Sequence, residues 1–369
     1  MGLLRLFLAL AVVGGHLSDH LGVPLIPGDS PVQVFFAISG FYMALILNEK
    51  YAVGSTSLFF TNRMLRIYPL YIAVLLLTLL AAWVGAALSL EPFPFRDSWT
   101  QLKPDWLSSI YLYISQALLL GQDLMYFLDL RNGSLHPSAD FHTATGPFNR
   151  FSIVTQAWTL SIEIWFYMVA PLIARRSLSV IVALLVASLA LRMGLQSGFG
   201  FKDDPWSYRF FPSEFALFLT GILGYHAYRE RNTRGNAMRI FVIAAVCVGI
   251  CLLINRWNGI GRVASITCLV AAIILIPTLF GRTNRNLIDR YLGELSYPIY
   301  VIHLLASWVI IEMTAGWPLA WQAAAVMIGT VVSAAVLYAL ISEPIERLRQ
   351  RRAKALVIRG ARADTRQRP

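Results

Sequence analysis

The sequence predicts an all-α, polytopic membrane protein in which about ten transmembrane helices form one bundle. Of its 369 residues, 57% are hydrophobic and only 14% are charged, whereas soluble proteins are typically about 45–50% apolar and about 25% charged. The apolar residues also come in long runs of the length that crosses a bilayer. So much apolar surface exceeds what one soluble core buries, and lipid is expected to cover the rest.

Candidate spans follow from the length of these runs, because a membrane-spanning helix needs about 20 mostly apolar residues. A weaker run, 106–122, carries serines and glutamines among its Leu, Ile and Tyr residues. We interpret it as an amphipathic or re-entrant piece at the membrane surface. The ten stronger candidates are 3–20, 31–48, 66–89, 152–174, 177–196, 210–229, 237–255, 262–280, 293–313 and 319–342.

The distribution of basic residues predicts the topology. Ten spans put both termini on one side of the membrane, and that side carries 22 of the 31 Lys and Arg residues, against 8 on the other. Cytoplasmic loops are the ones enriched in Lys and Arg. We therefore expect cytoplasmic termini and an extracytoplasmic segment 90–151, the one long loop. Because the basic clusters are short and lie between apolar runs, the net charge of +11 indicates topology and no nucleic-acid partner.

The chain divides into a transmembrane domain, 1–345, and a basic cytoplasmic tail, 346–369, which its composition predicts to be disordered. Cys247, Cys251 and Cys268 all lie inside apolar runs, and no C-x-x-C spacing occurs. They are expected to pack in helices, with no disulfide framework and no metal site.

Ionisable groups at membrane depth are costly, so each is a candidate for function. Arg5 and His16 are eleven residues apart on the first span, which places them on one helix face with a rise of about 16 Å between them. A donor with an anionic head at Arg5 and a long arm would reach His16, whose imidazole can act as general base or as nucleophile. A topology arginine and a structural histidine explain the pair equally well. Asp19 and His20 follow one turn later, where either can orient the imidazole; a metal held by the two histidines would lack a third ligand.

A polar stripe marks the fourth strong span. Thr155, Thr159, Glu163 and Tyr167 recur every four residues on an otherwise apolar helix. A buried carboxylate needs partners, which hydroxyls of the stripe can supply. We favour a functional role for Glu163, orienting or stabilising the catalytic imidazole, over a structural anchor between helices.

Three shorter elements are ambiguous taken singly. Arg63 and Arg66 share a helix face just before the third span, where they suit phosphate oxygens or merely follow the positive-inside rule. Ser39 lies beside a glycine in mid-span, a pattern also typical of close helix packing. Tyr300 and His303 follow Pro298, and such polar side chains can simply satisfy the carbonyl that a proline frees.

Together these elements resemble, in order, the motifs of the acyltransferase 3 family, integral-membrane enzymes that O-acylate bacterial surface and exported polysaccharides. The resemblance covers about 1–345. Each string is short, but five in order on ten spans are hard to reach by chance. The matching elements are Arg5 with His16 (basic-X10-His), Phe35–Phe41 (Phe-Phe-x-x-Ser-Gly-Phe), Arg63 with Arg66 (Arg-x-x-Arg), Trp158 with Leu160 and Glu163 (Trp-x-Leu-x-x-Glu), and Ser296, Tyr297, Tyr300 and His303 (Ser-Tyr-x-x-Tyr-x-x-His).

The resemblance implies an acyl-CoA-dependent acyltransferase of the bacterial inner membrane. It implies that a carbohydrate hydroxyl at the outer face receives the acyl group, by family precedent acetyl, and that acetyl-CoA is a substrate rather than a permanently bound cofactor. His16 and Glu163 would be catalytic, and Arg5, Arg63 and Arg66 would bind the donor. Supporting roles would go to Ser39, Asp19, Tyr167, Tyr300 and His303. A transporter or flippase of a glycan or lipid-linked sugar is the alternative, although the sequence lacks the inverted repeats and paired broken helices typical of that class.

Overall fold

The computed structural model describes residues 1–17, 30–51, 56–88, 98, 102–230, 236–255 and 260–352. It confirms the all-α fold class, since helices dominate and the sheet is one two-stranded hairpin. The α-helices are α1 (Gly2–His16), α3 (Ser30–Glu49), α4 (Thr56–Ala87), α6 (Trp106–Leu118), α7 (Trp158–Ile173), α8 (Leu178–Phe199), α9 (Phe211–Arg229), α10 (Ala237–Asn255), α11 (Ile260–Thr283), α12 (Leu287–Met313) and α13 (Leu319–Leu337).

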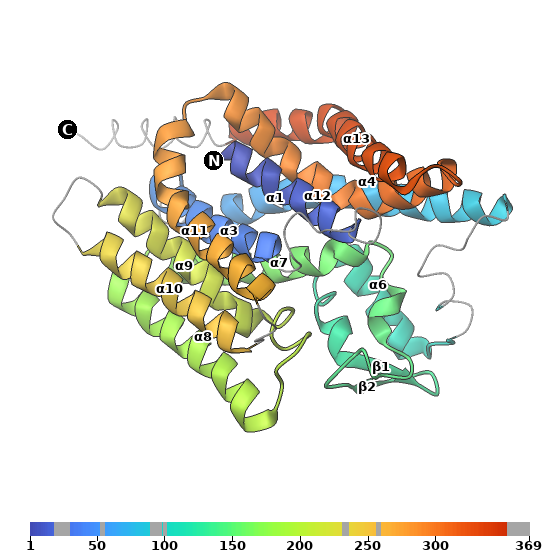
Figure 1. The fold of residues 1–369 in the computed structure, drawn as a ribbon, viewed down its shortest axis with the longest axis horizontal. Helices are drawn as coiled ribbons and strands as arrows, with labels where there is room; N and C mark the ends of the chain where they lie inside the picture. The colour runs from blue at the N-terminus through green and yellow to red at the C-terminus, as the bar shows by residue number, and fades with distance from the viewer. Residues whose placement is uncertain are drawn as a thin grey trace, which may run out of the picture.

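The long helices form two groups that meet along α3 and α7 (Figure 1). In the first group α9 packs against α3, α8, α10 and α11. In the second group α12 packs against α1, α4 and α13. Contacts of α1 and α7 with α3, and of α4 with α7, join the two groups. The candidate site described below lies between them.

Two glycines explain how closely α3 and α9 approach. A Cβ atom on Gly40 would lie 2.0 Å from the carbonyl oxygen of Phe218, and one on Gly221 would lie 1.9 Å from that of Ala37. No side chain fits at either position, and small residues at membrane helix interfaces let backbones come together. Gly40 of the Phe-Phe-Ala-Ile-Ser-Gly-Phe element is therefore a packing residue, whereas the neighbouring Ser39 faces the site.

A buried ion pair joins α8 to α9. The Arg192 Nη1 atom lies 2.9 Å from Glu214 Oε1, and the two side chains are 5% and 0% exposed. Gln33 on α3 donates from Nε2 to both carboxylate oxygens at 3.2 Å. Each charge removed from water here has an opposite charge and hydrogen bonds as compensation, as a buried ion requires.

The segment between α4 and α7 has its own small core. The run predicted to be amphipathic begins with helix α6, whose N-cap Asp105 accepts a hydrogen bond from the Ser108 backbone at 2.8 Å. The outer face of α6 is apolar and exposed at Trp106, Leu107, Ile110, Tyr113, Ile114 and Leu118. Strands β1 (Leu128–Arg131) and β2 (Ser134–Pro137) pair antiparallel next to α6. They are followed by two short 3-10 helices, η2 (Phe148–Phe151) and η3 (Thr155–Ala157). The described part of the predicted long loop 90–151 is thus folded.

Within the described residues each of the ten predicted spans overlaps a helix, but the count of ten transmembrane crossings stays a prediction. Within the described residues, seven helices are long and apolar enough to cross a membrane: α3, α4, α8, α10, α11, α12 and the helical stretch Leu319–Arg352. Helix α1 is apolar but short, α7 has only 16 residues, and α9 contains Glu214 and Arg229.

Two boundaries differ from the sequence-based expectation. Helix α4 begins at Thr56, so Arg63 and Arg66 lie well inside it rather than before it. After α13 the chain passes through a π-helical turn, η4 (Tyr338–Ser342), and remains helical to Arg352. The tail predicted to be disordered from 346 is helical at its start. There Arg349 is buried and bonds to Glu346, which fixes this turn of the helix. Residues 353–369 lie outside the described part.

Candidate active site

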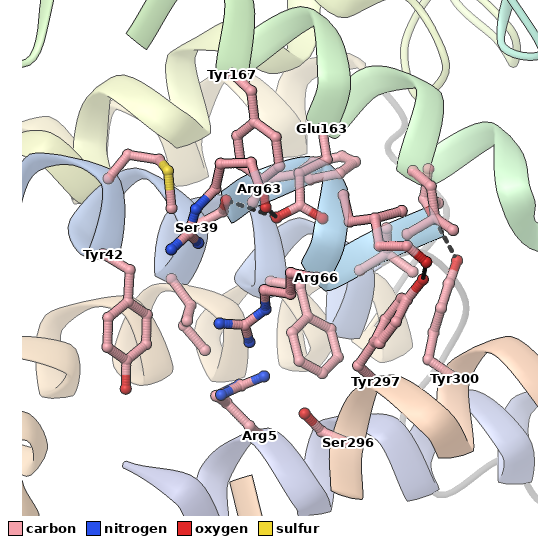
Figure 2. A pocket seen from close by; sticks show the side chains of 18 residues that line it. Arg5, Ser39, Tyr42, Arg63, Arg66, Glu163, Tyr167, Ser296, Tyr297 and Tyr300 are labelled. Atoms are coloured by element: carbon pink, nitrogen blue, oxygen red, sulfur yellow. Dashed lines mark hydrogen bonds between the residues drawn. The ribbon is translucent and has the colours of Figure 1, made fainter. Parts of the chain in front are cut away.

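A cavity between the two helix groups collects three of the predicted basic residues. We call it the arginine cavity; its empty volume is about 800 Å³. Side chains from α1, α3, α4, α7 and α12 converge on it (Figure 2). Its polar lining residues are Arg5, Ser39, Tyr42, Arg63, Arg66, Thr159, Glu163, Tyr167, Ser296, Tyr297 and Tyr300.

The three arginines come from two helices that are far apart in sequence. Arg5 extends from α1, and Arg63 and Arg66 extend from neighbouring turns of α4. Arg63 is only 5% exposed, and its Cζ atom lies 5.9 Å from the ring centroids of both Phe59 and Tyr167. None of the three forms a close ion pair with a carboxylate among the described residues. Guanidinium groups held in this way are suited to bind phosphate oxygens.

Glu163 faces the same cavity and is held by hydroxyl groups. Ser39 Oγ donates to Glu163 Oε1 at 2.9 Å, and the Tyr167 hydroxyl donates to the same oxygen. Two members of the predicted polar stripe and one residue of α3 thus form a single hydrogen-bonded group. Tyr167, Glu163 and Thr159 follow one another along α7. The Thr159 hydroxyl lies 2.8 Å from the Tyr300 hydroxyl.

A second cavity contains His16, and we call it the histidine cavity. Its empty volume is about 900 Å³, and its polar lining residues are His16, Tyr126, Thr155, Gln156, Trp158, Asp204, Tyr208, Arg209 and Tyr300. The His16 side chain is exposed to this space although its helix is packed on other sides. Val32 and Tyr300 line both cavities, so the two cavities lie next to each other at these residues.

Arg209 forms one wall of the histidine cavity. Its Cζ atom lies 3.9 Å from the ring centroid of Tyr126 and 4.2 Å from that of Trp158. Its Nε atom lies 3.0 Å from both carboxylate oxygens of Asp204, and its Nη1 atom is buried without a hydrogen-bond partner among the described residues. The cation is therefore fixed in place by two aromatic faces and one carboxylate.

The ring of His303 packs against that of His16. The ring centroids are 5.1 Å apart, and the planes are tilted by 35°. His303 is fully buried on α12, and its Nδ1 atom lies 2.6 Å from the Tyr300 carbonyl oxygen.

Most of the predicted site residues come together, but in two places. Arg5, Arg63, Arg66, Ser39, Glu163, Tyr167 and Tyr300 line the arginine cavity, whereas His16 lines the histidine cavity with His303 behind it. The expected direct stabilisation of the His16 imidazolium by Glu163 is not seen, because the two side chains face different cavities. Asp19 and His20 lie outside the described residues.

Sequence reasoning missed Arg209, Tyr42 and Tyr297. In the sequence Arg209 is one of several loop charges, and nothing near it indicates a role in the site. Its neighbours in the structure, Tyr126 and Trp158, are distant in sequence. Tyr297 stood in a recognised element, and its hydroxyl donates to the Ile67 carbonyl at 2.7 Å, which ties α12 to α4. Within the described residues, no three His, Cys, Asp or Glu side chains come close enough to hold a metal ion.

Near α7, outside the predicted spans, burial raises the pKa of Asp123 to about 6. Its carboxylate accepts hydrogen bonds from Ser161 Oγ at 2.5 Å and from Trp165 Nε1 at 3.3 Å. Asp123 thus fixes α7, which carries Glu163, against the segment before it.

Comparisons with known proteins identify the family. A family model described as an acyltransferase domain matches residues 1–339. The chain is 26% identical over 377 aligned positions to nodulation protein 10 of Rhizobium leguminosarum bv. viciae, covering 94% of this chain and 93% of that relative. It is 24% identical over 213 positions to an uncharacterized protein of Aquifex aeolicus (strain VF5), covering 53% of this chain and 89% of that relative. No solved structure matches. The family model covers nearly the whole chain of this multi-pass membrane protein. The protein therefore belongs to the acyltransferase 3 family.

Proposed function

We propose that this membrane O-acyltransferase transfers an acetyl group from cytoplasmic acetyl-CoA to a carbohydrate hydroxyl at the outer face of the bacterial inner membrane. The observation that carries the proposal is that the two cavities lie next to each other at Val32 and Tyr300. One cavity offers guanidinium groups for the donor, and the other offers an imidazole for the acceptor.

In the arginine cavity the phosphates of CoA would lie against Arg5, Arg63 and Arg66. Charge-assisted hydrogen bonds from guanidinium to phosphate are strong and directional. The pantetheine arm would then run past Ser39 and Glu163 toward Tyr300, which brings the thioester to the border of the histidine cavity. Glu163 is already engaged by Ser39 and Tyr167, so its role is to shape this passage and balance the arginine charges.

In the histidine cavity the acceptor hydroxyl would meet His16. The imidazole takes the hydroxyl proton, the oxygen attacks the thioester carbon, and the CoA sulfur leaves with the electron pair of its bond and receives the proton from His16. This is general base and then general acid catalysis by one group. Gln156 Oε1 and Arg209 Nη1, which lack partners among the described residues, are suited to bind further hydroxyl or acidic groups of the acceptor.

The orientation follows from the charge distribution in the sequence. With both termini cytoplasmic, Arg5 lies at the cytoplasmic end of α1 and His16 toward the outer side. Residues 1–345 then form the transmembrane domain, and the folded segment between α4 and α7 covers the histidine cavity from outside.

The test uses purified protein in lipid vesicles with radiolabelled acetyl-CoA and a membrane extract as the source of acceptor. We expect labelled glycan with the wild-type protein and at least a 100-fold loss with His16→Ala, because a positioned general base typically contributes about 10²–10⁴-fold. His226→Ala is the matched control, since His226 lies on α9 and lines neither cavity. Normal labelling by a folded His16→Ala protein would remove the proposed mechanism.

A further inference from the structure

His16 needs a partner for the nitrogen that does not face the acceptor, and the structure offers one. A general base works in a single tautomer, which a hydrogen bond to its second nitrogen selects. Helix α1 packs along α12, and this packing brings the imidazole of His303 against that of His16 with centroids 5.1 Å apart. The structure records no hydrogen bond between the two rings, so a side-chain rotation of His16 is needed to bring one of its nitrogens within hydrogen-bond range of His303.

The tautomer of His303 is fixed by its own helix. The Nδ1 atom lies 2.6 Å from the carbonyl oxygen of Tyr300, which can only accept, so Nδ1 carries the hydrogen. The Nε2 atom is then an acceptor. It is buried and has no partner among the described residues. An unmet acceptor of this kind is unfavourable unless something donates to it.

The other charged and titratable groups that the structure describes around His16 are less suited to that role. Arg209 is a cation and cannot accept a hydrogen bond. Both carboxylate oxygens of Asp204 already accept from the Nε atom of Arg209. Glu163 faces the arginine cavity with Ser39 and Tyr167 as its donors. The remaining titratable groups that line the histidine cavity in the described residues are Tyr126, Tyr208 and Tyr300.

We propose that His303 is the positioning residue of the reaction: its Nε2 atom accepts the N–H of His16 and leaves the other His16 nitrogen free to take the acceptor proton. When His16 becomes an imidazolium, the same hydrogen bond stabilises the charge. A neutral imidazole does this without placing a second charge beside Arg209. The inference rests on the proposed function for its role in catalysis, but the hydrogen bond itself can be tested without turnover.

The test uses two variants that separate the two nitrogens of His303. In His303→Asn, the amide nitrogen takes the place of Nδ1 and keeps the bond to the Tyr300 carbonyl, but nothing reaches the Nε2 position. In His303→Gln, the longer amide presents its oxygen near the Nε2 position and can accept from His16. A purely structural role for His303 would not favour Gln over Asn.

The readout is the reaction of His16 with diethyl pyrocarbonate, followed across pH by peptide mass spectrometry. Only the neutral imidazole reacts, so the midpoint pH of the rate reports how strongly the charged form is stabilised. We expect the midpoint to fall by about one to two pH units in His303→Asn, because the imidazolium of His16 loses a hydrogen bond. In His303→Gln the midpoint should stay near the wild-type value. Ile299→Ala, at another fully buried position of α12, controls for packing loss and should leave the midpoint unchanged.

Release of CoA from acetyl-CoA by the same proteins, with the membrane extract added as the source of acceptor, supplies the catalytic readout. We expect kcat to fall about 10- to 100-fold in His303→Asn with an unchanged KM for acetyl-CoA, and to recover in His303→Gln. Identical midpoints in wild type and both variants would overturn the inference. So would a shift in Asp19→Asn with none in His303→Asn, since Asp19 would then be the partner. If wild-type protein releases no CoA, the proposed function fails, whereas the midpoints still decide the histidine pair.

Discussion

Glu163 and His16 line different cavities, and Tyr300 borders both. The Glu163 carboxylate is turned toward the arginines by its bonds to Ser39 and Tyr167. The His16 ring is backed by His303 and faces Arg209 across the other cavity. Under the proposed function, this separation would place donor binding in the arginine cavity and proton transfer in the histidine cavity.

The arginine cavity should recognise the phosphates of the donor. Arg66→Ala should raise KM for acetyl-CoA about 10- to 100-fold with a smaller change in kcat, because a lost charge-assisted hydrogen bond costs about 1.5–3 kcal/mol. KM for S-acetyl-pantetheine, which has no phosphate, should not change. Arg290→Ala is the control, since Arg290 is exposed on α12 and does not line the cavity. Equal effects on the two donors would contradict phosphate binding.

The charge distribution predicts which side each loop faces. A cysteine at position 131, in the hairpin, should react with a membrane-impermeant maleimide in intact spheroplasts. A cysteine at position 285, between α11 and α12, should react only after permeabilisation. Both positions are exposed, and the experiment requires replacement of Cys247, Cys251 and Cys268. The reverse pattern would invert the proposed orientation.

The buried ion pair between Arg192 and Glu214 should be necessary for stability but replaceable as a unit. Arg192→Met alone leaves Glu214 charged and without its cation, which should cost about 3–5 kcal/mol. The double variant Arg192→Met with Glu214→Gln should recover a large part of that loss. Thermal unfolding in detergent measures the wild type, Arg192→Met, Glu214→Gln and the double variant. Additive losses in the double variant would show that the two residues do not interact.

Asp123 should make stability depend on pH. Burial raises its pKa in the folded protein to about 6, against an ordinary value of 3.8. The folded state thus holds the proton more tightly than the unfolded state, and the associated stability is present below about pH 4 and lost as pH rises through 6. The loss amounts to roughly 2–3 kcal/mol.

Asp123→Asn cannot ionise, yet its amide oxygen can still accept from Ser161 and Trp165. Its melting temperature relative to the wild-type protein should therefore rise steadily between pH 4 and pH 7. A constant difference over that range would mean that Asp123 ionises with an ordinary pKa.

Several features were determined by the sequence alone. The excess of apolar runs required a membrane protein, and each run of about 20 residues became a helix because lipid leaves a backbone no other partner for its polar groups. The four-residue spacing of Thr159, Glu163 and Tyr167 placed them on one face of α7, since helical periodicity is local. The same periodicity predicted a shared face of α1 for Arg5 and His16, and the structure places them in two different cavities.

Only the tertiary structure decided which of these faces meet. The close approach of α3 to α9 at Gly40 and Gly221 orients Ser39 toward Glu163, and the packing of α1 on α12 pairs His16 with His303. Arg209 reaches Tyr126 and Trp158 through a loop whose path no local pattern encodes. Such contacts depend on the shapes of surfaces far apart in the chain, and a one-dimensional period carries no information about them.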